Sequence, residues 1–363
     1  MLGSFFWNPS REIIQIPFIN LPLLWYGALF ASGFAIGYLI FISILKRFLQ
    51  YYPEYYLGDI VSNREISNKI LNARSFFSIA SEAQNQLSEN EVLEFLNDSL
   101  NEGTTGASDE HIRLENRYAL DEELNPHVLP INKKSSIIAD KILFYMVLAT
   151  IIGSRLGHFL FYENPSDYLS DLMQIFRIRD GGHASHGAVI GILIAMAIFS
   201  YKVKKYLPQL NWLKTLDLIC IPAALGGAFI RVGNFFNQEI LGKACNLPWS
   251  VVFGSPADLS APIARHPVQL YEACFYLCLF FLLYLLSYNE KFLLKRGKLI
   301  GLFLSLVFSF RFLIEYFKED QSYFSHIFNL NMGQLLSIPL VILGALFLFY
   351  KRKDQANSEM VNF

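Results

Sequence analysis

Seven long apolar segments constrain this chain more than any other feature. They cover about residues 22–45, 139–162, 184–201, 212–231, 268–287, 299–316 and 333–350. Each approaches the roughly 20 residues that an α-helix needs to cross the hydrocarbon core of a bilayer. Because backbone polar groups inside a bilayer must be hydrogen-bonded within the protein, such segments cross it as helices. We therefore predict an all-α polytopic membrane protein with seven transmembrane helices.

Four groups of basic residues flank these segments, and all four groups fall on one side. The flanking groups are Lys46 and Arg47, Lys202 to Lys205, Lys291 to Lys298, and Lys351 to Lys353. The positive-inside rule makes this side cytoplasmic, which places the N-terminus outside and the C-terminal tail inside. The N-terminal sequence lacks the basic start and small-residue cleavage site of a signal peptide, so the first span is expected to stay in the mature protein.

The composition divides the chain into four parts. We expect an N-terminal segment with the first span (1–49), a polar cytoplasmic insertion (50–136), spans two to seven (137–353) and a cytoplasmic tail (354–363). The insertion is acidic and poor in apolar runs, as partly ordered segments are. Between the fourth and fifth spans, near 243–266, mixed Pro, Gly and β-prone residues predict a small extracytoplasmic cap with short strands. The net charge of −1 gives no reason to expect a nucleic-acid partner.

The stretch Phe229–Gly242, FIRVGNFFNQEILG, carries the clearest sign of a functional site. It ends an apolar run, and Arg231 and Asn234 are three residues apart, so a continuing helix puts both on one face. A cation and amides at the mouth of a membrane helix are costly unless they meet a partner or a ligand. We interpret this stretch as the anion-holding part of a membrane site.

Polar residues from several other spans fall at a similar depth. The set comprises Tyr26, His158, His186, Arg231, Asn234, Glu239, Glu272, Arg311 and Glu315. Two arginines suit a phosphate, so the set predicts an outward-facing site for a phospholipid head group. Other roles stay open for single members: Tyr26 fits an interfacial aromatic belt, His186 a structural hydrogen bond, and Arg311 an intrahelical pair with Glu315. Glu272 requires a cation or donor nearby.

Other classes of protein fit this sequence less well. It has no H-E-x-x-H motif, no P-loop and no assignable Ser-His-Asp set, so we expect no metal and no cofactor. A transporter of small anions is expected to show repeat symmetry between its halves, and none is visible. A retinal receptor needs a lysine in its last span. The last span of this chain, GQLLSIPLVILGALFLF, has none. A structural scaffold leaves the outer polar set without a purpose.

Four motifs in order, GGHASHGAVIG, RVGNFFNQEILG, RHPVQLYE and RFLIEYF, resemble the signatures of the prolipoprotein diacylglyceryl transferases. The resemblance covers nearly all of the chain outside 50–136. It implies a seven-span enzyme of the inner membrane that moves a diacylglyceryl group from phosphatidylglycerol to the lipobox cysteine of a prolipoprotein. The products are a thioether and glycerol 1-phosphate. The implied partners are phosphatidylglycerol, lipobox signal peptides and membrane lipid.

The same resemblance implies roles for individual residues. Catalytic roles fall on His186, Arg231, Arg311 and Tyr26. Phosphatidylglycerol binding falls on Arg231, Asn234, Glu239, Arg311 and Glu315. His186 is then the general base toward the substrate thiol, and the two arginines hold the phosphate as it leaves. Lys318 stands where the family often has arginine.

Overall fold

The computed structural model describes residues 4–16, 21–52, 131–162, 184–204, 207–319 and 330–349 of the 363. The chain forms two compact units, one of Met1–Phe48 with Ala139–Phe363 and one of Leu49–Ile138. Most of the predicted insertion (50–136), the tail (354–363) and the loop around Asp180 lie outside the described residues. The helical bundle and the polar site belong to the first unit.

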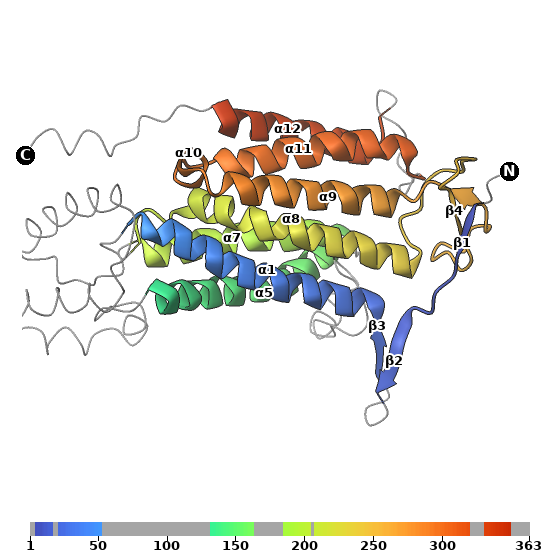
Figure 1. Ribbon diagram of the computed structural model, residues 1–363, viewed down its shortest axis with the longest axis horizontal. Coiled ribbons are helices and arrows are strands. Elements are labelled where there is room, and N and C mark those ends of the chain that lie inside the picture. Colours follow the sequence, from blue (N-terminus) through green and yellow to red (C-terminus); the bar gives the residue numbers. More distant parts are fainter. Residues whose placement is uncertain are drawn as a thin grey trace, which may run out of the picture. The chain divides into compact units, whose positions relative to one another are not determined.

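Helices dominate the described part of the chain (Figure 1). They are α1 (Trp25–Gln50), α5 (Ile131–Tyr162), α7 (Ser185–Val203), α8 (Trp212–Asn237), α9 (Val268–Leu286), α10 (Glu290–Leu293), α11 (Lys298–Ile314) and α12 (Met332–Phe349), with a 3₁₀ turn, η5 (Glu315–Phe317), after α11. Seven of the described helices are long and apolar enough to cross a membrane. The predicted polytopic helical architecture is therefore confirmed.

Helix α8 has the most buried residues of these spans. It packs against α7, α9 and α11. Helix α1 also approaches it closely, because a Cβ atom on Gly33 would lie 2.9 Å from the Cβ of Phe229. The C-terminal end of α8, where Arg231 lies, is therefore surrounded by several helices.

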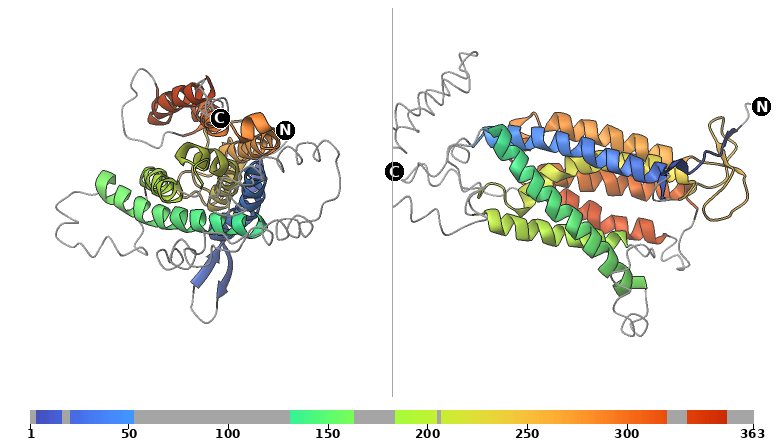
Figure 2. Two further views of the ribbon diagram at one scale, coloured as in Figure 1. Left: turned by 90° about the vertical axis from the view of Figure 1, so that its left-hand side faces the viewer. Right: turned by 90° about the horizontal axis from the view of Figure 1, so that it is seen from below.

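Helices α5 and α7 touch backbone to backbone. A Cβ atom on Gly157 would lie 2.6 Å from the Cα of Gly187, and one on Gly191 would lie 3.2 Å from the Cα of Gly153. Only glycine permits an approach this close. Since Gly187 follows His186, this contact sets the position of the histidine. Helix α5, green in Figure 2, runs obliquely to the other spans.

Short strands cover one end of the bundle. They are β1 (Phe5–Trp7), β2 (Glu12–Ile16), β3 (Leu21–Leu24), β4 (Val251–Phe253) and β5 (Ala264–Arg265). The order β1-β4-β5 forms a sheet in which β1 is parallel and β5 antiparallel to β4, while β2 and β3 form a hairpin that projects sideways in Figure 1. The strands predicted near 243–266 are confirmed, whereas the three N-terminal strands were not predicted.

The cap is fixed to the end of α8 by a small apolar core. Phe235, Leu241, Val251 and Phe253 are buried together, and Trp7 packs against them. The indole Nε1 of Trp7 donates to the carbonyl oxygen of Phe235 at 3.1 Å, and the same carbonyl, near the end of α8, also accepts from the N–H of Gln238 at 3.2 Å. The sheet therefore holds in place the turn that follows Arg231.

At the opposite end, buried Lys214 and Asp217 connect α8 to α11. The Nζ of Lys214 lies 2.9 Å from the Oδ2 of Asp217. That carboxylate also accepts from the backbone N–H groups of Gly297 (2.6 Å) and Ile300 (2.9 Å), at the start of α11. A carboxylate at a helix N-terminus satisfies unpaired donors and complements the helix dipole. Asp217 thus serves helix packing.

We expect Asp217→Asn to lower the free energy of unfolding by about 2 kcal/mol. Asparagine keeps an acceptor for one backbone N–H but leaves the buried Lys214 ammonium without a counter-charge. Thermal unfolding in detergent measures the loss. Asp258→Asn, at an exposed position of the cap, is the matched control. Equal melting temperatures for the two variants would contradict the assignment.

Candidate active site

Arg231 begins a chain of polar contacts at the end of α8. Its Nη1 donates to the Oδ1 of Asn234 at 3.3 Å, and the Nδ2 of Asn234 donates to the Oε1 of Glu239 at 2.6 Å. The shared helical face predicted from the three-residue spacing is confirmed. Asn237 reaches the same Glu239 oxygen at 3.4 Å. The amides thus link a cation to a carboxylate without an ion pair between them.

A tight turn after α8 returns Glu239 to the helix that precedes it. Gln238 and Ile240 have φ values of 55° and 57°, and the N–H of Glu239 donates to the carbonyl oxygen of Asn234 at 3.1 Å. The left-handed region is rare for a β-branched residue such as Ile240. Farther along, a Cβ atom on Gly242 would lie 2.8 Å from the Cβ of His266. Gly242 therefore allows the turn to pack against the start of α9.

Glu272 of α9 connects the Arg231 group to the end of α11. Its Oε2 lies 3.2 Å from the Nε of Arg231, and its Oε1 lies 2.9 Å from the Nζ of Lys318. The side chains of Glu272 and Lys318 are only 4% and 6% exposed. A buried carboxylate between two cations has the counter-charge that the sequence required. Glu272 belongs to the predicted polar set, as an intramembrane carboxylate in RHPVQLYE, but was given no catalytic or lipid-binding role, and Lys318 was noted only as standing where the family often has arginine.

The intrahelical pair between Arg311 and Glu315, which the sequence left open as an alternative, does not form in the structure. Glu315 instead lies 3.5 Å from the Nζ of Lys318 and accepts from the Nδ2 of Asn331 at 3.1 Å. The physical reason is that α11 ends at Ile314 and a 3₁₀ turn begins at Glu315. In a 3₁₀ turn residues i and i+3 eclipse, which aligns Glu315 with Lys318.

Arg311 differs from the other two cations of the site. It is exposed and, within the described ranges, forms no ion pair with any carboxylate. The hydroxyl of Tyr276 nevertheless lies within electrostatic range of Arg311, Arg231 and Glu272. Both predicted arginines, from α8 and α11, therefore lie near one tyrosine of α9. Arg311 is the cation whose charge is available to a ligand.

Tyr26 also belongs to this group. It lies within electrostatic range of Glu239 and Arg231, and a Cβ atom on Gly233 would lie 2.8 Å from its ring. The start of α1 thus packs on the polar end of α8. Of the residues that were given catalytic or lipid-binding roles, the structure brings together all except one.

The exception is His186. It is exposed at the start of α7 and, in the part of the chain that the structure describes, has no hydrogen bond or ion pair with the Arg231 group. Its neighbours in sequence on the N-terminal side, 163–183, lie outside the described residues. Among described residues, no group of three His, Cys, Asp or Glu side chains could hold a metal ion.

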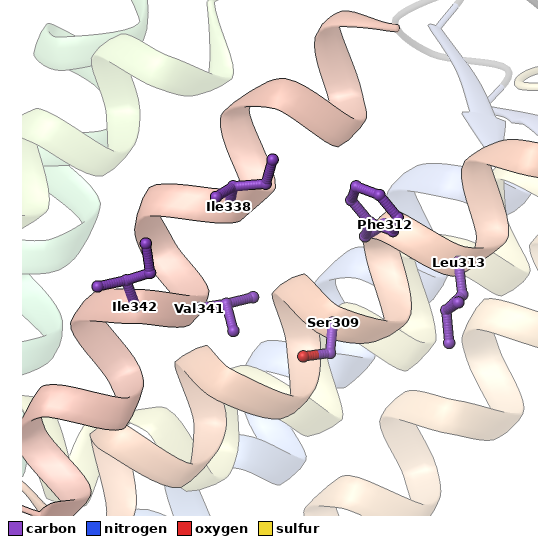
Figure 3. A pocket seen from close by; sticks show the side chains of 6 residues that line it. All are labelled: Ser309, Phe312, Leu313, Ile338, Val341 and Ile342. Carbon is purple, nitrogen blue, oxygen red and sulfur yellow. The ribbon is translucent and has the colours of Figure 1, made fainter. Parts of the chain in front are cut away.

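An apolar groove lies between α11 and α12, beside Arg311. Its volume is about 350 Å³, and Figure 3 shows Phe312 and Ile338 facing each other across it. The remaining lining residues are Ser309, Leu313, Val341 and Ile342. The two helices approach each other closely where a Cβ atom on Gly301 would lie 2.9 Å from the carbonyl oxygen of Gly344. This lining suits hydrocarbon, so the polar chemistry belongs to the Arg231 group and not to the groove.

The fold and the site together define a class. A seven-span bundle holds a buried ion network near one end, with one arginine that no described carboxylate neutralises. Such a network is costly inside a membrane, so the chain is a polytopic membrane protein with a charged site near the bilayer edge. The arrangement distinguishes it from a bundle that only anchors other domains.

Comparison with known proteins identifies the family. The family profile described as prolipoprotein diacylglyceryl transferase matches residues 120–350. The chain is 36% identical to the phosphatidylglycerol–prolipoprotein diacylglyceryl transferase of Protochlamydia amoebophila, over 98% of this chain and 96% of that protein. It is 42% identical to the proteins of that name from Tolumonas auensis and Chloroherpeton thalassium, over 60% and 61% of this chain and 80% of each relative. The chain belongs to the prolipoprotein diacylglyceryl transferase family.

Proposed function

We propose that this protein transfers the diacylglyceryl group of phosphatidylglycerol to the lipobox cysteine thiol of a prolipoprotein, the first step of bacterial lipoprotein maturation. One observation carries the proposal: Arg231 and Arg311, from separate helices, lie near one tyrosine, and Arg311 has no described carboxylate partner. Guanidinium groups in this arrangement suit a phosphate. The names of the relatives support the same substrates.

The orientation follows from the charges at the two ends of the bundle. Arg47, Lys202 and Arg296 lie at the end opposite the strands, and the positive-inside rule assigns that end to the cytoplasm. The cap and the N-terminus are then outside, while residues 50–136 and 354–363 are cytoplasmic. In the inner membrane, this places the site at the outer leaflet, where a translocated prolipoprotein presents its cysteine.

The proposed reaction is a displacement at carbon. The thiol loses its proton to His186, because the thiolate is the nucleophile. The sulfur then attacks the carbon of the diacylglyceryl unit that bears the phosphate ester. A C–S bond forms while the bond between that carbon and the phosphate oxygen breaks. Glycerol 1-phosphate leaves with the electron pair, and Arg231 and Arg311 stabilise its charge. The proton on His186 passes to solvent, which restores the base.

Supporting residues keep this arrangement in place. Asn234 and Glu239 orient Arg231 through the amide link, and Tyr26 packs over the same helical end. Glu315 receives Lys318 and Asn331, which fixes the end of α11 next to Arg311. The proposal therefore requires no metal and no cofactor.

Reconstituted transfer tests the function directly. The protein is placed in vesicles with a lipobox peptide and phosphatidylglycerol labelled in its acyl chains and in its terminal glycerol. We expect equal amounts of labelled thioether peptide and labelled glycerol phosphate, and no product in vesicles of phosphatidylcholine alone. Folded protein that forms no thioether from phosphatidylglycerol overturns the proposal.

The role of His186 is tested by His186→Asn, which we expect to lower kcat by about a hundredfold, as loss of a general base does. Raising the pH should restore part of this activity, because hydroxide then generates the thiolate without the imidazole. Full activity of the variant at neutral pH would exclude His186 as the base and leave the phosphate assignment unaffected.

A further inference from the structure

Tyr276 of α9 lies within electrostatic range of both site arginines, although no motif in the sequence pointed to it. We propose that its hydroxyl is a third hydrogen-bond donor to the phosphate of the anionic lipid, between Arg231 and Arg311. This inference rests on the proposed function, because it assumes that the two arginines hold that phosphate.

Packing against α8 directs the tyrosine ring. A Cβ atom on Gly227 would lie 3.0 Å from the Cδ1 and 3.2 Å from the Cε1 of Tyr276. Gly227 is four residues before Arg231, one helical turn, and Tyr276 is four residues after Glu272. Because the ring packs on Gly227, one turn from Arg231, and starts one turn from Glu272, its hydroxyl lies beside the Arg231–Glu272 ion pair. A side chain at position 227 would displace the ring.

The hydroxyl proton of Tyr276 has no hydrogen-bond acceptor among the described side chains. Arg231 is the hydrogen-bonding neighbour of the hydroxyl, and a guanidinium can only donate, so the phenolic oxygen is the acceptor. The Oε1 of Glu272 accepts from the Nζ of Lys318, and its Oε2, 3.2 Å from the Nε of Arg231, forms no hydrogen bond with any described group, the Tyr276 hydroxyl included. The Tyr276 proton is thus free for an incoming acceptor.

An anion between the arginines would supply that acceptor. A phosphate diester has two unesterified oxygens, and charge-assisted hydrogen bonds to them are shorter and stronger than neutral ones. Arg231 and Arg311 are both within electrostatic range of the hydroxyl, so a phosphate that contacts both lies close to Tyr276. Two guanidinium groups and one phenol then bind the same head group.

The variant Tyr276→Phe keeps the ring on Gly227 and removes only the hydroxyl. We expect KM for phosphatidylglycerol to rise about tenfold or more, the size of a lost hydrogen bond to a charged group. KM for the lipobox peptide and the melting temperature without added lipid should stay at wild-type values. Tyr284→Phe, two turns farther along α9 and beside Tyr288, is the matched control.

Two results would overturn the inference. One is an unchanged KM for phosphatidylglycerol in Tyr276→Phe. The other is a fall in lipid-free melting temperature greater than that of Tyr284→Phe, because the hydroxyl would then serve structure. Gly227→Ala supplies an independent variant, and it should raise the same KM by displacing the ring.

The arginine variants separate this inference from the proposed function. If Arg231→Ala and Arg311→Ala lose transfer while Tyr276→Phe matches wild type, only the role of Tyr276 is wrong. If the arginine variants keep full transfer, the phosphate assignment is wrong, and the role of Tyr276 with it.

Discussion

Replacing Arg311 with alanine is expected to lower kcat/KM for diacylglyceryl transfer about a thousandfold. Preorganised groups that stabilise charge in a transition state have effects of this size, because they act where little water competes. Arg311 is the site cation with no ion pair to a described carboxylate, so its whole charge is available to the departing phosphate. Initial rates of labelled transfer in vesicles measure the effect.

Two further variants test whether the effect of Arg311→Ala is specific. Arg311→Lys keeps the charge but loses the planar fork, so it should retain more activity than alanine and less than wild type. Arg296→Ala removes an exposed arginine that donates to Gln209 at the opposite end of the bundle, and its transfer rate should not change. A wild-type rate of transfer by Arg311→Ala would show that Arg311 does not bind the phosphate.

Replacing Glu272 with alanine is expected to lower the free energy of unfolding by about 3–5 kcal/mol. The change leaves both Arg231 and Lys318 without the carboxylate that lies between them. Their side chains are 18% and 6% exposed, so water compensates little for the loss. Chemical or thermal unfolding in detergent, without substrate, measures the difference.

A double-mutant cycle checks that the loss comes from unpaired charge. Lys318→Met alone should also destabilise the protein, but Glu272→Ala combined with Lys318→Met should cost less than the sum of the two. Lys318→Arg should preserve stability, because arginine also donates to Glu272 and Glu315. Additive effects of the two substitutions would show that the buried pair is not coupled.

Much of the architecture could be predicted from the sequence. Seven spans, the strands near 243–266 and the common helical face of Arg231 and Asn234 are local properties, which depend on hydrophobic run length or on helical spacing. The need of Glu272 for a cation was also predictable, because an unpaired carboxylate in a membrane span is costly whatever surrounds it. The family motifs pointed to Arg231, Asn234 and Glu239, which the structure brought together, and also to His186, which it did not.

Partners across helices could not be predicted in this way. Glu315 pairs with Lys318 and not with Arg311 because the helix changes to a 3₁₀ turn at that residue. Tyr276 reaches the arginines because Gly227, on another helix, leaves room for its ring. Strand β1 joins β4, more than 240 residues away, through backbone groups that carry no sequence signal.

The sequence by itself determined which segments lie in the membrane and which polar residues needed partners there. Only the tertiary structure decided which residues are their ion-pair and hydrogen-bond partners. Hydrophobic burial depends on residue type along one helix, whereas an ion pair between helices depends on how each helix is rotated and where it ends. In this protein those rotations leave Arg311 without an ion pair to any carboxylate in the described ranges, and they place Glu272 between two cations.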